Sequence, residues 1–232
     1  MDASPQRAAF RRLHESGCFV IPNPWDIGTA IMLKQLGFKA LATTSAGFSF
    51  SRGLPDADWA VPRGMALEHI AEIVRATDLP VNADFESGYA REPEGVAESC
   101  RLCAATGVAG LSIEDHGDSA DEVIYPFDVA VERVKAAAAA LKGTGVLLTA
   151  RCEAHLFGVP DAQKIVLRRL VAFAEAGADV LYAPGLRTPE QIREVVQAVA
   201  PKPVNLLVSA PIGLSVADAA ALGVRRISVG SA

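Results

Sequence analysis

The sequence contains no apolar run that is long enough to cross a membrane. No hydrophobic stretch approaches the ~18 residues that a transmembrane helix needs. The N-terminal segment MDASPQRAAFRRLHESG also has no apolar core of the kind found in secretory signal peptides. We therefore expect a cytoplasmic protein with no membrane partner.

The chain is also poor in basic charge and in cysteine. Its formal net charge is −5 at pH 7, which argues against a nucleic-acid partner because such a partner requires a basic surface. Four cysteines, Cys18, Cys100, Cys103 and Cys152, form no dense framework in 232 residues, so we expect reduced thiols. No histidine pair has the spacing of a zinc site.

What the sequence does contain is a regular alternation of two patterns. Eight short apolar or β-branched runs have the length of buried strands: Cys18–Ile21, Ala40–Thr44, Pro80–Ala83, Gly110–Ile113, Val146–Ala150, Val180–Ala183, Val204–Val208 and Arg226–Val229. Seven stretches with helical periodicity lie between them: Ile27–Leu36, Pro62–Ala76, Pro93–Ala105, Asp128–Leu141, Ala162–Ala176, Pro189–Val199 and Val216–Leu222. Hydrophobic residues make up 50% of the chain, which is enough for a sizeable core.

This alternation predicts a parallel sheet, and eight units favour closure into a (β/α)8 TIM barrel. The whole chain, residues 1–232, is then one catalytic domain, and the eighth outer helix is missing from this sequence. An open doubly wound sheet is the alternative, but no G-x-G-x-x-G or G-x-x-x-x-G-K motif follows the first strand. A further helix near Pro5–Ser16 is expected to cover the bottom of the barrel.

Two loops of the predicted barrel are longer than usual. They cover Ser45–Val61 and Asp115–Phe127, each directly after a strand. Long loops at a barrel mouth typically act as lids or contact the substrate.

Carboxylates follow several of the predicted strands. Asp84 and Glu86 come at the end of the third strand, Glu114 ends the fourth, and Asp56 lies in the long loop before them. The C-terminal ends of all the strands meet at one mouth, where barrel enzymes keep their chemistry. Since side chains two apart on a strand point to one side, Asp84 and Glu86 are expected to converge on one ion. A set of hard oxygens suits Mg²⁺ or Mn²⁺.

Arg151 ends the fifth strand and offers a planar fork for a carboxylate or a phosphate. The alternative for Arg151 is an ion pair with Glu153 or Asp115. The segment Thr44, Ser45 and Ala46, at the end of the second strand, is expected to present hydroxyl and backbone N–H groups to an anion.

Two further side chains are candidates for the site. His116 lies in the second long loop and is an acid or base candidate, with a plain loop histidine as the alternative. Trp25 follows the first strand and is a candidate for a wall of the substrate pocket.

Together these motifs resemble the isocitrate lyase/phosphoenolpyruvate mutase superfamily over nearly the whole chain. P-V-N-A-D-F-E-S-G-Y (80–89) resembles its metal motif, G-V-A-G-L-S-I-E-D (107–115) its I-E-D strand, A-R-C-E-A (150–154) its A-R-[TV]-[DE]-A motif, and G-L-P-D (53–56) its loop aspartate. The resemblance implies a Mg²⁺-dependent barrel that acts on 2-oxo or 2-hydroxy acids, as a homo-oligomer, a dimer or tetramer.

The resemblance also implies roles for individual residues. Asp84 would hold the metal, with Glu86 and Glu114 contributing directly or through water, and Asp56 would lie near the metal. Arg151 and the backbone of Thr44, Ser45 and Ala46 would hold the substrate carboxylate.

Departures from the family pattern narrow the activity. The K-[KR]-C-G-H motif of isocitrate and methylisocitrate lyases is replaced by H-G-D-S-A-D-E-V-I-Y-P, which has neither cysteine nor lysine. The D-K-x-F-P-K-x-N-S segment of the phosphonopyruvate-directed members is missing as well, and Pro184 replaces their histidine after strand six. Glu86 stands where the family usually has aspartate.

Three hypotheses for the function remain. The first is a Mg²⁺-dependent lyase or decarboxylase of a small 2-oxo or 2-hydroxy acid, which acts through a metal-stabilised enolate. The second is a C–P enzyme of the phosphonomutase kind. The third is a non-catalytic barrel that binds a keto acid.

Overall fold

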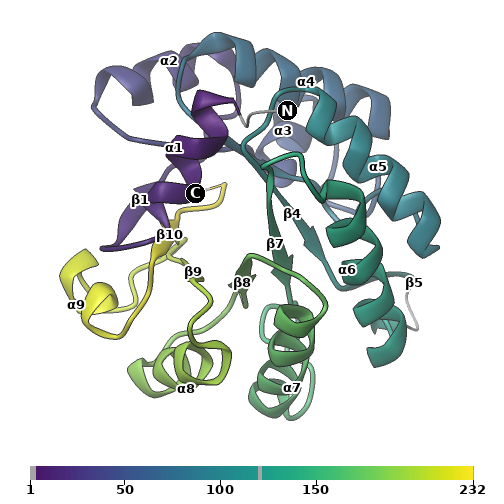
Figure 1. Ribbon diagram of the computed structural model, residues 1–232, viewed down its shortest axis with the longest axis vertical. Helices are drawn as coiled ribbons and strands as arrows, with labels where there is room; N and C mark the ends of the chain where they lie inside the picture. Colours follow the sequence, from purple (N-terminus) through teal and green to yellow (C-terminus); the bar gives the residue numbers. More distant parts are fainter. Residues whose placement is uncertain (1–3, 120–121, 232) are drawn as a thin grey trace.

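The computed structural model describes residues 4–119 and 122–231 and contains eight parallel strands in one sheet. The order of the strands is β1-β10-β9-β8-β7-β4-β3-β2, and helices surround them (Figure 1). The strands are β1 (Phe19–Ile21), β2 (Leu41–Ala42), β3 (Val81–Asp84), β4 (Gly110–Glu114), β7 (Leu147–Arg151), β8 (Val180–Tyr182), β9 (Val204–Leu207) and β10 (Arg226–Ser228). The outer helices are α2 (Ile27–Gln35), α4 (Arg63–Ala76), α5 (Pro93–Ala105), α6 (Phe127–Leu141), α7 (Ala162–Glu175), α8 (Pro189–Val199) and α9 (Val216–Ala221).

The two edge strands, β1 and β2, are joined through the residues that follow β1. The backbone N–H of Ala42 donates to the carbonyl of Pro22 at 3.0 Å. The side-chain amide of Asn23 donates to the carbonyl of Thr43 at 3.1 Å. These bonds bridge the seam, so the sheet is a near-closed TIM-like α/β barrel and the predicted fold class is confirmed.

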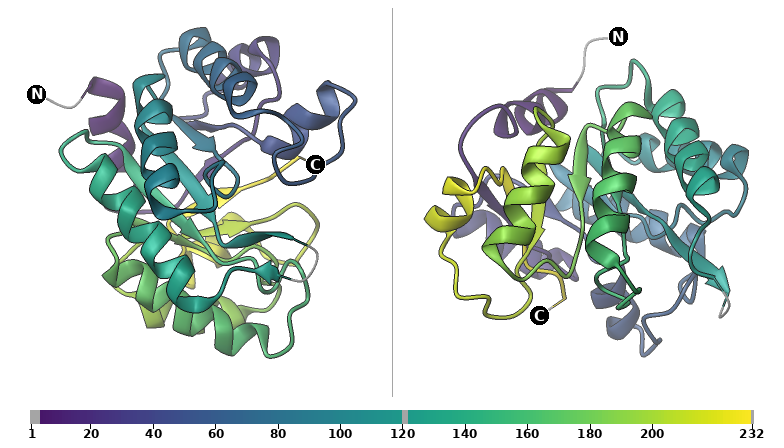
Figure 2. Two further views of the ribbon diagram at one scale, coloured as in Figure 1. Left: turned by 90° about the vertical axis from the view of Figure 1, so that its right-hand side faces the viewer. Right: turned by 90° about the horizontal axis from the view of Figure 1, so that it is seen from below.

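The N-terminal helix α1 (Pro5–Leu13) closes one end of the barrel, as expected. Phe10 is fully buried there against residues that include Ile21 and Leu147. Arg7 donates to the carbonyls of Ala104, Val108 and Thr144, which precede β4 and β7. In the left view of Figure 2, α1 therefore lies at the end of the barrel opposite to the C-terminus.

The first long loop was predicted wrongly, because it contains the helix α3 (Ser45–Ser51). The sequence of α3, SAGFSFS, has low helix propensity, which hides it from pattern analysis. Thr44 caps the helix by accepting the N–H of Gly47 at 3.2 Å. Phe48 buries α3 against Val61 and Ala66, so tertiary packing stabilises what propensity does not.

The second long loop contains a β-hairpin rather than irregular chain. Its strands β5 (His116–Ser119) and β6 (Glu122–Ile124) are antiparallel, with a shift in their register. In the described part of the chain, β5 and β6 pair only with each other, so the hairpin is a separate two-stranded sheet. Both α3 and this hairpin lie at the end of the barrel away from α1 (Figure 2).

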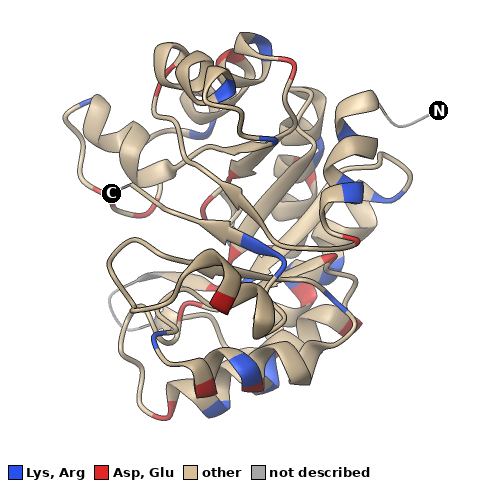
Figure 3. Ribbon diagram, turned by 90° about the vertical axis from the view of Figure 1, so that its left-hand side faces the viewer, with Lys and Arg blue, Asp and Glu red and all other residues tan. Residues whose placement is uncertain are grey.

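The surface carries charges of both signs. Figure 3 shows lysine and arginine interspersed with aspartate and glutamate along the outer helices. Among the described residues, no helix is both long and apolar enough to cross a membrane.

Candidate active site

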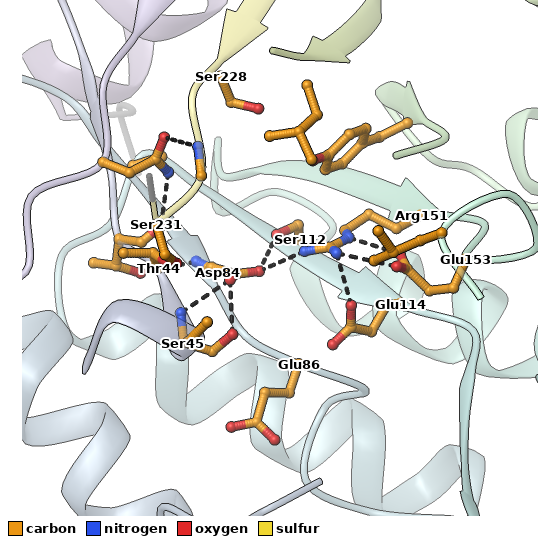
Figure 4. A pocket seen from close by; sticks show the side chains of 18 of the residues that line it. Thr44, Ser45, Asp84, Glu86, Ser112, Glu114, Arg151, Glu153, Ser228 and Ser231 are labelled. Carbon is orange, nitrogen blue, oxygen red and sulfur yellow. Dashed lines mark hydrogen bonds and ion pairs between the residues drawn. The ribbon is translucent and has the colours of Figure 1, made fainter. Parts of the chain in front are cut away.

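A cavity of about 470 Å³ opens at the C-terminal ends of the strands. Nine of the ten candidate residues from the sequence line it: Thr44, Ser45, Ala46, Asp56, Asp84, Glu86, Glu114, His116 and Arg151. The barrel thus brings together residues that are more than a hundred positions apart in the sequence (Figure 4).

Arg151 is the centre of an ion-pair cluster. Its Nη1 lies 2.8 Å from Asp84 Oδ1, its Nη2 2.9 Å from Glu114 Oε2, and its Nε 2.8 Å from Glu153 Oε1. Burial by itself would lower the pKa of Arg151, but the charges of Glu114, Glu153 and Asp84 outweigh burial and hold the pKa above its usual range. The guanidinium is therefore charged and fixed in orientation, and the ion pair with Glu153 that was the alternative for Arg151 is present.

Asp84 joins this cluster to α3. Its Oδ2 accepts the backbone N–H of Ser45 at 3.0 Å and the hydroxyl of Ser45 at 2.8 Å. Its Oδ1 bonds Arg151 and lies 3.4 Å from the hydroxyl of Ser112. The Ser45 N–H and hydroxyl thus bond the protein's own carboxylate, and their role toward a substrate anion stays a prediction.

Glu86 does not converge with Asp84 in the way that strand alternation predicts. Its backbone has a φ of +47°, so the strand has ended, and Glu86 makes its contacts outside the cluster around Arg151 (Figure 4). Oε2 accepts the N–H of Trp59 at 2.9 Å, and Oε1 accepts the hydroxyl of Tyr89 at 2.6 Å. Burial raises the pKa of Glu86 to about 7, against the opposing effect of these two bonds.

The donor set therefore fits a divalent cation held by few protein oxygens. Within the described ranges, no three His, Cys, Asp or Glu side chains are grouped so that they could hold a metal. Asp84 and Glu114 line the cavity and share Arg151 as a partner, whereas the two oxygens of Glu86, which also lines the cavity, bond Trp59 and Tyr89. Mg²⁺ commonly takes one or two carboxylates and keeps several waters, so Asp84 and Glu114 fit this ion.

His116 lies at the rim of the cavity in a defined arrangement. Its Nδ1 lies 2.8 Å from Asp58 Oδ1, and its ring stacks on Phe157 at 4.2 Å between centroids. The hydrogen bond to Asp58 raises the pKa of His116. Asp56 lies at the same rim, where partial burial and the charge of Asp84 raise its pKa.

Trp25 is the one candidate outside the cavity lining. Its ring makes an edge contact with Phe50 at 6.2 Å, and its indole lies against Gly47. Trp25 thus packs against Gly47 and Phe50 of α3, outside the cavity lining, and positions that helix instead of forming a wall of the pocket.

Comparison with known proteins identifies the family. A family model described as phosphoenolpyruvate phosphomutase matches residues 10–232. The chain belongs to the phosphoenolpyruvate mutase family. The resemblance found in the sequence motifs is therefore confirmed.

Two curated relatives of this family illustrate its range. An uncharacterised protein of Mycobacterium tuberculosis is 34% identical, over 96% of this chain and 82% of its own length. An oxaloacetate decarboxylase of Paraburkholderia xenovorans is 31% identical, over 98% of this chain and 76% of its own length.

Solved structures with the same fold include proteins with bound ligands. A Burkholderia cenocepacia protein, provisionally named a lyase/mutase, is 49% identical with a TM-score of 0.92, and the match covers 97% of this chain and 81% of that one. Oxaloacetate acetylhydrolase in complex with its product oxalate is 29% identical, with a TM-score of 0.87 over 97% of this chain and 80% of that one. Phosphonopyruvate hydrolase in complex with oxalate and Mg²⁺ is 26% identical, with a TM-score of 0.88 over 97% of this chain and 80% of that one.

Several cavity residues escaped the sequence analysis of this family member. Asp58 was missed as the partner of His116, because pairing partners depend on the tertiary structure, whereas Glu153 had been named as a possible ion-pair partner of Arg151. Tyr182 lines the cavity, its ring 4.9 Å from the Arg151 guanidinium carbon, and burial raises its pKa to about 12. Asn205 and Arg226 were missed although each is a polar residue inside an apolar run, which is the signal that could have found them.

Proposed function

We propose that this chain is a Mg²⁺-dependent lyase or decarboxylase of a small 2-oxo or 2-hydroxy carboxylic acid. The observation that carries the proposal is the contact of Arg151 with Asp84 and Glu114 inside a cavity of about 470 Å³. A fixed guanidinium beside hard-oxygen carboxylates suits a small anionic substrate next to a divalent cation. The relatives that act on oxaloacetate, and the one that binds oxalate with Mg²⁺, support the same chemistry.

Arg151 would bind and orient the substrate carboxylate in this reaction. Its planar fork matches two carboxylate oxygens, and Glu153 holds the far edge of the fork in place. The hydroxyl and N–H of Ser45 would then be shared between Asp84 and the incoming anion. Holding the substrate in one orientation supplies a large part of the rate enhancement in such reactions.

Asp84 and Glu114 are the residues that would hold the divalent cation, and Glu86 would contribute through water. When bound, the cation would stabilise the negative charge that develops on the substrate oxygen. For oxaloacetate, the C3–C4 bond breaks, carbon dioxide leaves, and the electron pair moves toward the C2 oxygen. A proton must then return to C3 to give pyruvate.

His116 is our candidate for holding that proton. Because its Nδ1 faces Asp58, the other ring nitrogen, Nε2, is the atom left to exchange a proton with a ligand. Phe157 covers one face of the ring and limits its movement.

The phosphonomutase alternative is less favoured. The segment that replaces the family's D-K-x-F-P-K-x-N-S motif here begins with the β5–β6 hairpin, and it offers neither lysine nor asparagine. The dimeric or tetrameric state and the cytoplasmic location stay predictions.

The test is an assay of oxaloacetate decarboxylation with Mg²⁺, with pyruvate measured by a coupled enzyme. We expect turnover above the rate without enzyme, loss of turnover with EDTA, and loss of turnover in Asp84→Asn. Isocitrate and methylisocitrate should not be cleaved, because the lid has no cysteine. Glyoxylate release from isocitrate near ~10 s⁻¹, a typical turnover number, would refute this assignment.

A further inference from the structure

Arg226 is a second buried arginine in the cavity, and neither motifs nor comparisons assign it a role. It begins β10, is 3% exposed, and lines the same cavity as Arg151. Burying an arginine is costly unless its charge and its N–H groups are matched by partners.

The partners of Arg226 are all neutral. Its Nε donates to Asn205 Oδ1 at 2.7 Å, its Nη2 to Thr149 Oγ1 at 3.1 Å, and its Nη1 lies 3.4 Å from His14 Nε2. Since His14 Nδ1 lies 2.8 Å from the carbonyl of Phe10 and donates to it, Nε2 is an acceptor toward Arg226. Burial and the charge of Arg226 lower the pKa of His14 to about 3, which keeps the imidazole neutral.

In the described part of the chain, no carboxylate forms an ion pair with Arg226. Two other buried arginines differ from it, because Arg151 contacts three carboxylates and Arg169 contacts Asp115 at 2.8 Å. A guanidinium has five N–H donors, and only three contacts of Arg226 are formed here. Arg226 therefore retains both an unbalanced charge and donor capacity.

Asn82, on β3, lines the same cavity as Arg226. It is 4% exposed, and its Oδ1 has no hydrogen-bond partner within the described ranges. An unpaired buried acceptor destabilises the folded state, so native structures normally give it a partner. This oxygen is enclosed next to Gly110, so Arg226 is the group that brings unmatched polarity to the cavity itself.

The sheet register connects Arg226 to Arg151. Arg151 pairs with Tyr182, Tyr182 with Asn205, and Asn205 with Arg226, on four adjacent strands. Neighbouring strands lie about 4.8 Å apart, so three spacings separate the two arginines along the curved wall, and the chord across the cavity is shorter. Two guanidinium groups therefore open on one small cavity from different parts of its wall.

We infer that Arg226 forms an inner subsite for the distal carboxylate of a small dicarboxylate, while Arg151 holds the carboxylate beside the cation. This inference rests on the proposed function and deepens it, because it names dicarboxylates as the substrate class. A monocarboxylate with the same head group would leave Arg226 without a counter-charge and bind more weakly.

The test compares malate with lactate, two 2-hydroxy acids that differ by the distal carboxylate. Their affinities for the full chain would be measured by titration calorimetry with saturating Mg²⁺. Wild type should bind malate more tightly than lactate, and Arg226→Gln should weaken malate binding by roughly 10- to 100-fold, as expected for loss of a charge-assisted hydrogen bond, without changing lactate binding. Arg225→Gln is the matched control, since its side chain contacts the carbonyl of Gly17 outside the cavity, and both affinities should stay unchanged.

Equal losses for malate and lactate in Arg226→Gln, or no loss for either, would overturn the inference. If this variant unfolds below the temperature of the titration, Arg226→Lys replaces it. Lysine keeps the charge and loses the fork, so the preference for malate should shrink, and an unchanged preference would count against the subsite. Because these are binding measurements, they test the subsite independently of turnover. A failure to decarboxylate oxaloacetate would refute the proposed reaction, and the malate and lactate affinities would still decide whether Arg226 binds a distal carboxylate.

Discussion

Arg151 and Glu153, two residues apart at the end of β7, form a two-pronged ion pair. Nε donates to Oε1 at 2.8 Å, and Nη2 donates to Oε2 at 3.2 Å. Glu153 is fully buried, so it cannot exchange Arg151 for water. This pair fixes one edge of the guanidinium and directs the other toward Asp84 and Glu114.

Replacing Arg151 by lysine should affect both stability and activity. A single ammonium cannot match three carboxylates, and Glu153 would keep a buried charge with a poorer partner, so we expect a loss of about 2–4 kcal/mol in the free energy of unfolding. The catalytic efficiency, kcat/KM, should fall by roughly 30- to 1000-fold, because the bidentate grip on the substrate is lost. Denaturant unfolding and steady-state kinetics on oxaloacetate measure the two effects.

Arg169→Lys provides the control for that experiment. Arg169 is also buried and paired with Asp115, but it does not line the cavity. The Arg169→Lys variant should have a lower free energy of unfolding but a kcat/KM near the wild-type value. If Arg151→Lys behaves in the same way, Arg151 has no role in substrate anchoring.

Metal binding should depend unequally on the carboxylates. Asp84→Asn should abolish Mg²⁺ binding in calorimetry, whereas Glu86→Gln should only weaken it, because Glu86 would contact the ion through water and not directly. The wild type should show about one site per chain, and so should Glu132→Gln, a change on the exposed face of α6. Unaltered binding by Asp84→Asn would rule out this metal site.

The stability of the protein should fall in acid because of His14. Its pKa is about 3 in the folded state and about 6.5 in the unfolded chain, so unfolding takes up a proton below pH 6.5. The stabilisation from neutral His14 is fully present above pH 6.5. As the pH falls below 6.5, the free energy of unfolding decreases by about 1.4 kcal/mol per pH unit, which amounts to about 2 kcal/mol at pH 5.

Urea unfolding of His14→Gln between pH 7 and 5 measures this effect. The variant should show a flatter pH dependence than the wild type, whatever its absolute stability. Arg12→Gln, a change at an exposed position two residues before His14, should retain the wild-type slope. Parallel curves for the wild type and His14→Gln would contradict the prediction.

The position of α3 should depend on the close approach of Gly47 to Trp25. A Cβ at Gly47 would lie 2.4 Å from Trp25 Nε1, so Gly47→Ala must displace the helix or the indole. We expect a loss of about 1–3 kcal/mol from overpacking, with lower activity because Ser45 would move from Asp84.

Gly64→Ala is the matched glycine substitution. Its Cβ would meet open space in α4, so it should be neutral or stabilising by up to about 1 kcal/mol. Thermal melting and kinetics of both variants test the role of α3. Wild-type stability in Gly47→Ala would show that Trp25 does not fix this helix.

The sequence alone determined the barrel and the composition of its mouth. Apolar runs such as Gly110–Ile113 alternate with amphipathic helices, and these patterns depend on local periodicity, which one chain displays without its fold. Asp84, Glu114 and Arg151 could be placed together because the C-terminal ends of parallel strands share one face.

Only the tertiary structure decided how these side chains pair and which way they point. The turn of Glu86 away from Asp84 follows from a positive φ that strand alternation does not foresee. The helix α3 forms on buried contacts of Phe48 that outweigh its low propensity. Arg226 stands out as a polar residue in an apolar run, but its place beside Asn205 in the cavity wall follows from the strand register, which local periodicity does not fix.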